Sequence, residues 1–256
     1  VLAYSGYGVW NINPTEEITA ADFGWSQYGG PIVIDGKTEA INSGVNAVIN
    51  IVSTKVQTCE KAIQDKMGTD LYGTNTDAAN GFIGLRAAID DGTNTVTYGG
   101  ISRTDWPIWK AQYFANAGTL RALTFALLQQ AYGAASIDND RPTIGVGVQR
   151  VFDKYHSMVL PSQRIANAEL ENAGFSNLAF NSMLIVVDSH APANQLLMLN
   201  ENWIKLYIHK ERDFDFQPFV QISNQDASVA KIRWMGQLCV DNPRMNARIV
   251  DISYVL

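Results

Sequence analysis

The sequence predicts an α+β fold in an elongated subunit, and three segments carry that prediction. An aromatic-rich stretch at the start alternates like paired strands, residues 37–67 have helical periodicity, and residues 231–240 and 247–252 alternate like strands of a closing sheet. The length agrees with this, because 256 residues with 46% hydrophobic side chains can bury a sizeable core.

The first 36 residues contain no Lys or Arg but six aromatic side chains. Two extended runs, 2–12 and 23–34, are separated by a polar stretch with Pro14, which predicts a long β-hairpin. A two-stranded hairpin cannot cover six rings by itself. We therefore expect a second copy of the chain to cover them.

Residues 37–67 contain no Pro and place apolar side chains every three or four positions. Asp35 is a candidate N-cap and Gly68 a candidate C-terminal stop. Such a helix is about 46 Å long at 1.5 Å per residue. A compact globule of this size is about 47 Å across. The helix would cross the whole molecule, which predicts a flattened, elongated subunit.

The middle of the chain predicts shorter elements. Residues 70–113 are rich in Gly, Asn, Thr and Asp, with one apolar helical patch over 82–89. Beyond them we expect helices over 119–132, 149–160 and 163–173, and strands over 143–148, 183–187, 196–199 and 203–208. The final strands then need partners from earlier in the chain.

Charge and cysteine usage limit the function classes. Charged residues make up 17% of the chain, against roughly 25% in ordinary domains, and depletion of charge is typical of interface cores. A net charge of −6 argues against a protein that reads nucleic acid by neutralising phosphates. Cys59 and Cys239 match no metal spacing and are expected to be reduced thiols. No segment is typical of membrane insertion or secretion.

No motif predicts a catalytic, cofactor or metal site. The three histidines lack partners at metal-ligand spacing, and the adjacent residues Asp188-Ser189-His190 would point to opposite faces of an extended chain. Gly145-Val146-Gly147 is followed by Arg150 where a dinucleotide fingerprint needs a third Gly. The acidic pairs Asp90-Asp91 and Asp213-Asp215 are predicted to be solvated loops.

The order of these segments, together with several short strings, resembles the major capsid protein of tailed bacteriophages. The strings are DDGT (90–93), YGGISR (98–103), LENAGF (170–175), VDSH (187–190), DFDF with PF (213–219) and NQDA (224–227).

The resemblance implies the Hong-Kong-97-type capsid fold. It implies the end of an N-terminal arm over 1–8, an extended loop over 9–36 and a peripheral domain over 37–114 with its spine helix over 37–67. An axial domain over 115–212 and peripheral-domain strands over 213–256 would follow. It further implies pentamers and hexamers that close into an icosahedral virion shell around double-stranded DNA, assembled in the host cytoplasm. Portal, scaffolding and decoration proteins are the implied partners, with nonspecific DNA contact.

Candidate interface residues follow from the same resemblance. On the loop they are Trp10, Glu16, Glu17, Asp22, Phe23, Trp25 and Tyr28, and their candidate basic partners are Arg86, Lys231, Arg244 and Arg248. Burying a large aromatic side chain contributes about 1.5–3 kcal/mol, whereas an exposed ion pair contributes about 0–1 kcal/mol. We therefore expect the aromatic rings to supply the affinity between copies and the charged residues to fix the register in which the copies align. The resemblance also implies that some relatives link neighbouring subunits covalently through a Lys on this loop. No Lys precedes Lys37, so we expect the loop to hold its neighbours noncovalently.

Two alternatives remain at the level of sequence. One is an encapsulin-like shell that encloses cargo enzymes, which shares the architecture. The other is an α+β hydrolase whose site includes Asp188 and His190.

Overall fold

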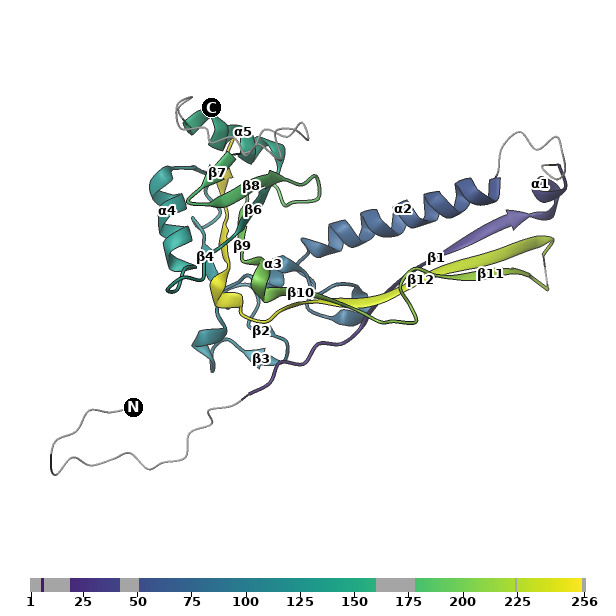
Figure 1. The fold of residues 1–256 in the computed structure, drawn as a ribbon, viewed down its shortest axis with the longest axis horizontal. Coiled ribbons are helices and arrows are strands. Elements are labelled where there is room, and N and C mark those ends of the chain that lie inside the picture. The colour runs from purple at the N-terminus through teal and green to yellow at the C-terminus, as the bar shows by residue number, and fades with distance from the viewer. Residues whose placement is uncertain (1–5, 7–18, 42–50, 160–177, 224, 255–256) are drawn as a thin grey trace.

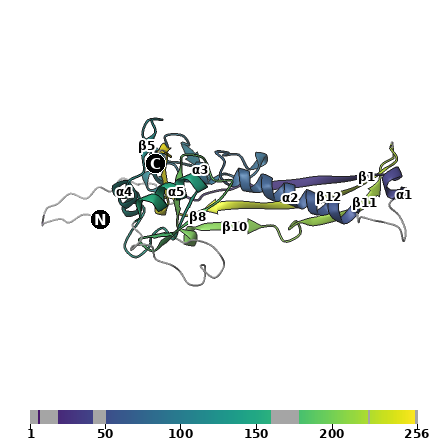
Figure 2. The same ribbon diagram turned by 90° about the horizontal axis from the view of Figure 1, so that it is seen from above.

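The computed structural model describes residues 6, 19–41, 51–159, 178–223 and 225–254. Figure 1 shows two regions, a rounded head and a long arm. The arm consists of β1, α1, α2, β10, β11 and β12, and Figure 2 shows α2 running along its strands. The head holds β4, β6–β9 and β13 with α4 and α5. The predicted α+β class and elongated form are confirmed.

The elements form a long series along the chain. Those of the first half are β1 (Ser26–Asp35), α1 (Gly36–Ile41), α2 (Ile51–Leu71), α3 (Leu85–Ala88), β2 (Thr97–Tyr98), β3 (Ile101–Ser102), β4 (Gln112–Phe114), β5 (Arg121–Ala122) and α4 (Phe125–Ala134). Those of the second half are β6 (Ile144–Gly147), α5 (Gln149–Met158), β7 (Leu178–Phe180), β8 (Met183–Val187), β9 (Leu196–Leu199), β10 (Ile204–Ile208), β11 (Asp215–Gln221), β12 (Ala227–Val240), β13 (Ala247–Ile249) and β14 (Ile252–Ser253).

Strand β12 is the centre of the arm sheet. It pairs antiparallel with β1 along one edge, and with β11 and then β10 along the other. The prediction that the final strands pair with earlier segments is therefore confirmed. The described partner of β1 is β12, whereas residues 2–12, the predicted hairpin partner of 23–34, lie outside the described residues. Residues 26–35 thus belong to their own chain's sheet.

Helix α2 covers one face of this sheet. Its side chains Val56, Cys59, Ile63 and Met67 pack into the core that holds the inward side chains of β1 and β12. The approach is closest at Gly30, where a Cβ atom would lie 2.5 Å from the Cys59 Sγ. The second half of the predicted apolar stripe, from Val56 to Met67, is therefore the surface of α2 that packs against the sheet.

The predicted ends of the long helix need correction. Asp35 does act as a cap, since its carboxylate accepts a hydrogen bond from the Thr38 N–H at 2.9 Å, but the helix that follows is the short α1. Residues 42–50 lie outside the described residues. Gly68 does not stop α2, which continues to Leu71. A Cβ atom at position 68 would lie 3.0 Å from the His190 ring, so Gly68 marks a close approach of this ring to α2 and not the end of the helix.

The head is built on a six-stranded sheet in the order β4-β13-β9-β6-β8-β7. Along β9, Leu196 and Met198 enter a core with α4 and α5, while Leu197 and Leu199 enter the core shared with the base of the arm. All four are buried because successive strand residues point to opposite faces and both faces are covered. At Gly145 on β6, a Cβ atom would lie 3.2 Å from the Met183 side chain of the neighbouring strand β8.

Several predicted elements of the head are confirmed. Strands β8 and β9 occupy the predicted residues 183–187 and 196–199. Helix α4 begins later than predicted, because Thr124 caps it by accepting a hydrogen bond from the Leu127 N–H at 3.2 Å. The helix expected over 163–173 lies outside the described residues.

Both cysteines are free thiols, as expected, with Cys239 buried and Cys59 half-buried. Within the described part of the chain, no helix is long and apolar enough to cross a membrane.

Candidate subunit interface

The face of the arm sheet turned away from α2 carries a row of three valines. Val33 on β1 pairs with Val229 on β12, and Val229 pairs with Val220 on β11. Paired residues of neighbouring strands point to the same face, so the three side chains lie side by side. Val33 is 46% and Val220 67% exposed. The row is a continuous apolar surface near the tip of the arm.

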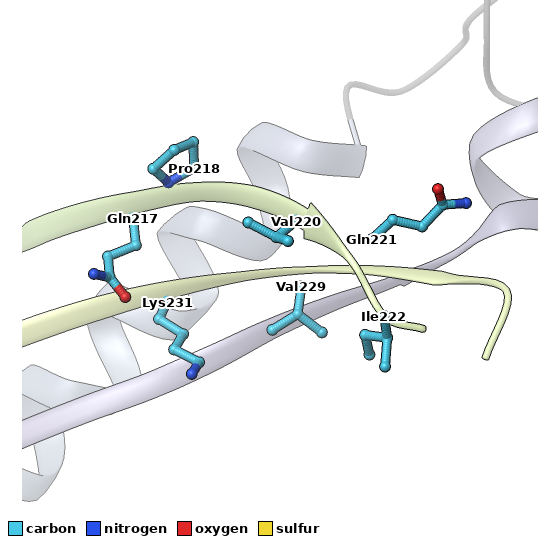
Figure 3. A pocket seen from close by; sticks show the side chains of 7 residues that line it. All are labelled: Gln217, Pro218, Val220, Gln221, Ile222, Val229 and Lys231. Carbon is cyan, nitrogen blue, oxygen red and sulfur yellow. The ribbon is translucent and has the colours of Figure 1, made fainter. Parts of the chain in front are cut away.

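A depression of about 590 Å³ adjoins this row, as Figure 3 shows. Its apolar lining includes Pro218, Ile222 and the two valines of β11 and β12, and its polar lining includes Lys231. The pairing of β11 with β12 is interrupted between Gln217 and Val220, where Pro218 has no N–H to donate. The irregular strand therefore leaves room for side chains from outside.

Towards the head, the same face becomes charged. Lys231 is exposed, and the next position along that face, Arg233, forms an ion pair with Asp215 at 2.5 Å. The surface thus offers an apolar row at the tip and a basic residue beside it. We call Val33, Val220, Val229, Ile222, Pro218 and Lys231 together the free face.

Strand β10 offers a second exposed apolar surface. Leu206, Tyr207 and Ile208 are all exposed, although in a strand they alternate between the two faces. Next to this strand, the exposed Trp25 ring meets the His209 ring edge-on at a centroid distance of 5.8 Å. Exposed strands of this kind are templates for pairing with another chain.

The predicted loop residues divide into three groups. Trp10, Glu16 and Glu17 lie outside the described residues. Asp22 and Trp25 are exposed, as an interface role requires. Phe23 is half-buried, with its ring 5.1 Å from that of Tyr98.

Tyr28 does not fit the predicted role. It is buried in its own chain between Phe82 and Trp234. Its hydroxyl donates to Asp70 at 3.0 Å and accepts from the Phe82 N–H at 2.7 Å. The regular alternation of β1 turns this ring towards α2, so Tyr28 does not belong to the candidate interface.

The four candidate basic partners also differ. Lys231 and Arg244 are exposed, and Arg86 is half-buried. Arg248 is only 4% exposed and pairs with Asp90 at 3.2 Å, while its other guanidinium nitrogen donates to the Arg86 carbonyl at 2.7 Å. Arg248 is therefore engaged inside its own chain and unable to meet a neighbour's acidic loop.

Asp90 is not the solvated loop residue that the sequence predicts. It is fully buried and accepts hydrogen bonds from the backbone of Gly92, Asn94 and Thr95 as well as from the Asn94 side chain. Burial alone would raise its pKa, but these hydrogen bonds outweigh it and hold the pKa below the ordinary value. Asp90 organises the turn that begins at the end of α3.

Arg103 is a structural residue that no sequence signal singled out. It is fully buried and donates to the carbonyls of Ala87, Thr95 and Trp109 at 2.8–3.2 Å, and to that of Ala88. The string YGGISR, which contributes to the resemblance, thus ends in the residue that ties this turn to α3.

The described residues assemble no catalytic centre that we recognise. His190 Nδ1 lies 3.5 Å from the Ser189 hydroxyl, too far for a strong hydrogen bond, and its Nε2 faces Asp65 at 2.9 Å. No group of three or more His, Cys, Asp or Glu side chains in the described ranges is placed to hold a metal ion.

No family model and no curated protein matches the chain. Solved structures do match it. The capsid asymmetric unit of cyanophage A-1(L) superposes with a TM-score of 0.70 at 19% identity, over 89% of this chain and 77% of that one. The chain has the Hong-Kong-97-type capsid fold.

Two further shells share this capsid fold. The holo-SrpI encapsulin complex from Synechococcus elongatus PCC 7942 gives a TM-score of 0.63 at 9% identity, over 91% of this chain and 75% of that one. The capsid of a native GTA particle gives a TM-score of 0.57 at 9% identity, over 90% of this chain and 73% of that one. The matched proteins come from phage capsids, a GTA particle and an encapsulin, and at these identities the match establishes the fold.

Proposed function

We propose that the chain is a non-enzymatic major capsid protein that assembles with copies of itself into the shell of a phage head. The observation that carries this proposal is the arm, whose sheet is covered by its own chain on one face and leaves an apolar row exposed on the other. Exposed apolar surface of this kind favours burial against another protein. The capsid fold favours a second copy of the chain as that protein.

In the full proposal, pentamers and hexamers close into an icosahedral virion shell around double-stranded DNA, assembled in the host cytoplasm. Portal, scaffolding and decoration proteins are the further partners. The free face and the exposed Trp25 supply apolar contact, while Asp22, Lys231, Arg244 and the half-buried Arg86 set the register between copies. The contacts are noncovalent, since residues 1–36 contain no Lys.

The test is to place one charge in the valine row. Val220→Asp should abolish shells of the full chain in negative-stain images and leave capsomers or monomers in sedimentation, because a carboxylate buried at a contact costs several kcal/mol. The free energy of unfolding of this variant should stay within about 0.5 kcal/mol of that of the unmodified chain, since Val220 is exposed.

Val96→Asp is the matched control, because Val96 is also an exposed valine but lies outside the arm sheet. It should assemble like the unmodified chain. If Val220→Asp forms normal shells, or if both variants fail alike, the free face is not the contact.

An encapsulin-like shell is the second candidate, favoured by the match to the encapsulin over 91% of this chain. The contents of purified particles distinguish the two. Packaged double-stranded DNA supports the phage head, whereas an enclosed protein without nucleic acid supports the compartment.

A further inference from the structure

A loop of the head contacts the helix of the arm through one histidine. His190 follows β8, and its Nε2 lies 2.9 Å from an Asp65 carboxylate oxygen on α2. Its other ring nitrogen lies 3.4 Å from Asp188. The ring rests against the helix backbone at Gly68, where a Cβ atom would lie 3.0–3.1 Å from it. The imidazole is thus held between two carboxylates that belong to different regions of the molecule.

Asp188 is fixed from the arm side as well. It accepts a hydrogen bond at 2.8 Å from the hydroxyl of Tyr72, a buried residue just after α2, and another at 2.8 Å from the His190 N–H. Burial opposes its ionisation, yet these hydrogen bonds prevail and hold its pKa below the ordinary value. The carboxylate therefore stays charged at neutral pH.

The charged groups that face the ring are Asp65 from α2 and Asp188 from the head loop. Lys66, the neighbour of Asp65, is turned to Asp70, with which it pairs at 2.7 Å. A neutral imidazole has one N–H and donates to one carboxylate, whereas the imidazolium donates to both. In the imidazolium the Nε2–H is always present for Asp65, and the positive charge adds an attraction between the head loop and the α2 carboxylate, so the strength of this head–arm contact depends on one proton.

We infer that His190 is a proton-operated clamp between the head and the arm, closed when the ring is protonated and loosened when it is neutral. Where the chain assembles as proposed above, loosening the clamp removes one of the contacts that fix the direction of the arm relative to the head, beside the core that the two regions share. The clamp itself is a property of the single chain and is testable without assembly.

The direction of the pH effect follows from the surroundings. The hydrogen bond with Asp65 raises the pKa of His190 above its ordinary value, partial burial opposes this, and Asp188 adds to the rise. A raised pKa in the folded state means that the clamp is fully closed below the ordinary value of about 6.5. Its contribution is lost as the pH rises through the higher folded-state value.

The experiment is hydrogen exchange by mass spectrometry on the full, unassembled chain at about pH 6 and about pH 8, on either side of the histidine range. After correction for the intrinsic exchange rate, residues 188–191 and the last turns of α2 should exchange several-fold faster at the higher pH. His190→Gln and Asp65→Asn should each remove this difference. His156→Gln, on α5 in the head, should preserve it.

Titration of the histidine ring signals by NMR gives an independent measure, with His190→Gln identifying the signal. A His190 pKa above the ordinary value supports the clamp, and Asp65→Asn should shift it down. A His190 that titrates at or below the ordinary value overturns the proposal. So does a variant at either position that keeps the pH difference in exchange, since the contact would then be structural only. Neither readout depends on whether shells form.

Discussion

The central strands of the head sheet are covered on both faces, whereas the arm sheet is covered by α2 on one face and exposes valines on the other. In the head, β9 is buried at every position, with alternate residues in two cores. In the arm, β1 is buried only at alternate positions. The central head sheet is therefore covered on both faces, one of them by the base of the arm, whereas the arm sheet is covered on one face only. In the capsid role proposed above, the half-covered region is where a neighbouring copy would bind.

The largest expected effect concerns the buried ion pair at the junction of the two regions. Arg248 lies on β13 of the head sheet, and Asp90 follows α3 at the base of the arm. Arg248→Ala leaves a buried carboxylate without its counter-charge and should lower the free energy of unfolding by about 3–5 kcal/mol. Urea denaturation of the unassembled chain measures this.

Arg244→Ala serves as the control, because Arg244 is exposed on the neighbouring turn. It should change the unfolding free energy by no more than about 0.5 kcal/mol. Equal effects of the two substitutions would mean that the pair does not join head and arm energetically.

The next prediction compares one substitution in both regions. Val146→Ala in β6 removes buried contacts and should cost about 2 kcal/mol of unfolding free energy, with assembly reduced only through stability. Val33→Ala in β1 should cost well under about 1 kcal/mol in the unassembled chain, because Val33 is 46% exposed. Its effect should appear instead as a higher concentration threshold for assembly, measured by light scattering. The reverse pattern would break the distinction between the two regions.

Elements were predictable from sequence where the signal is local. Strands β8 and β9 fall on the predicted residues, because short apolar runs between turn residues are typical of buried strands. Likewise, the spacing of the apolar residues in α2 predicts which of its side chains pack against the arm sheet. Pairing between distant segments is not predictable in the same way. Nothing local to β1 indicates that β12, near the other end of the chain, lies beside it with Asp35 opposite Ala227.

The sequence predicted an aromatic and apolar interface, but it did not show which residues belong to that interface and which are buried in the chain's own core. A glycine signals either a helix end or a close approach, and only the fold shows that Gly68 accommodates His190. In the same way, Asp90 and Arg248 look like surface charges in sequence, and their burial depends on α3 and β13 meeting in space. Alternation along β1 does carry the information that Tyr28 faces inward and Val33 outward, and it is the signal that separates core from interface on this strand.

The smallest expected effect tests how far the head depends on local signals. Thr124 caps α4 through its side-chain oxygen, so Thr124→Ala should lower the unfolding free energy by about 1 kcal/mol, whereas Thr124→Ser keeps the acceptor and should change it by a few tenths. Thermal and urea unfolding of the unassembled chain measure both, and assembly should be unchanged because the cap lies in the head. If Ala and Ser behave alike, the start of α4 is fixed by packing of Leu128 and Ala131 in the head core and not by its cap. In that case α4 is stabilised by burial of its side chains in the head core. The free face of the arm has no such burial within its own chain.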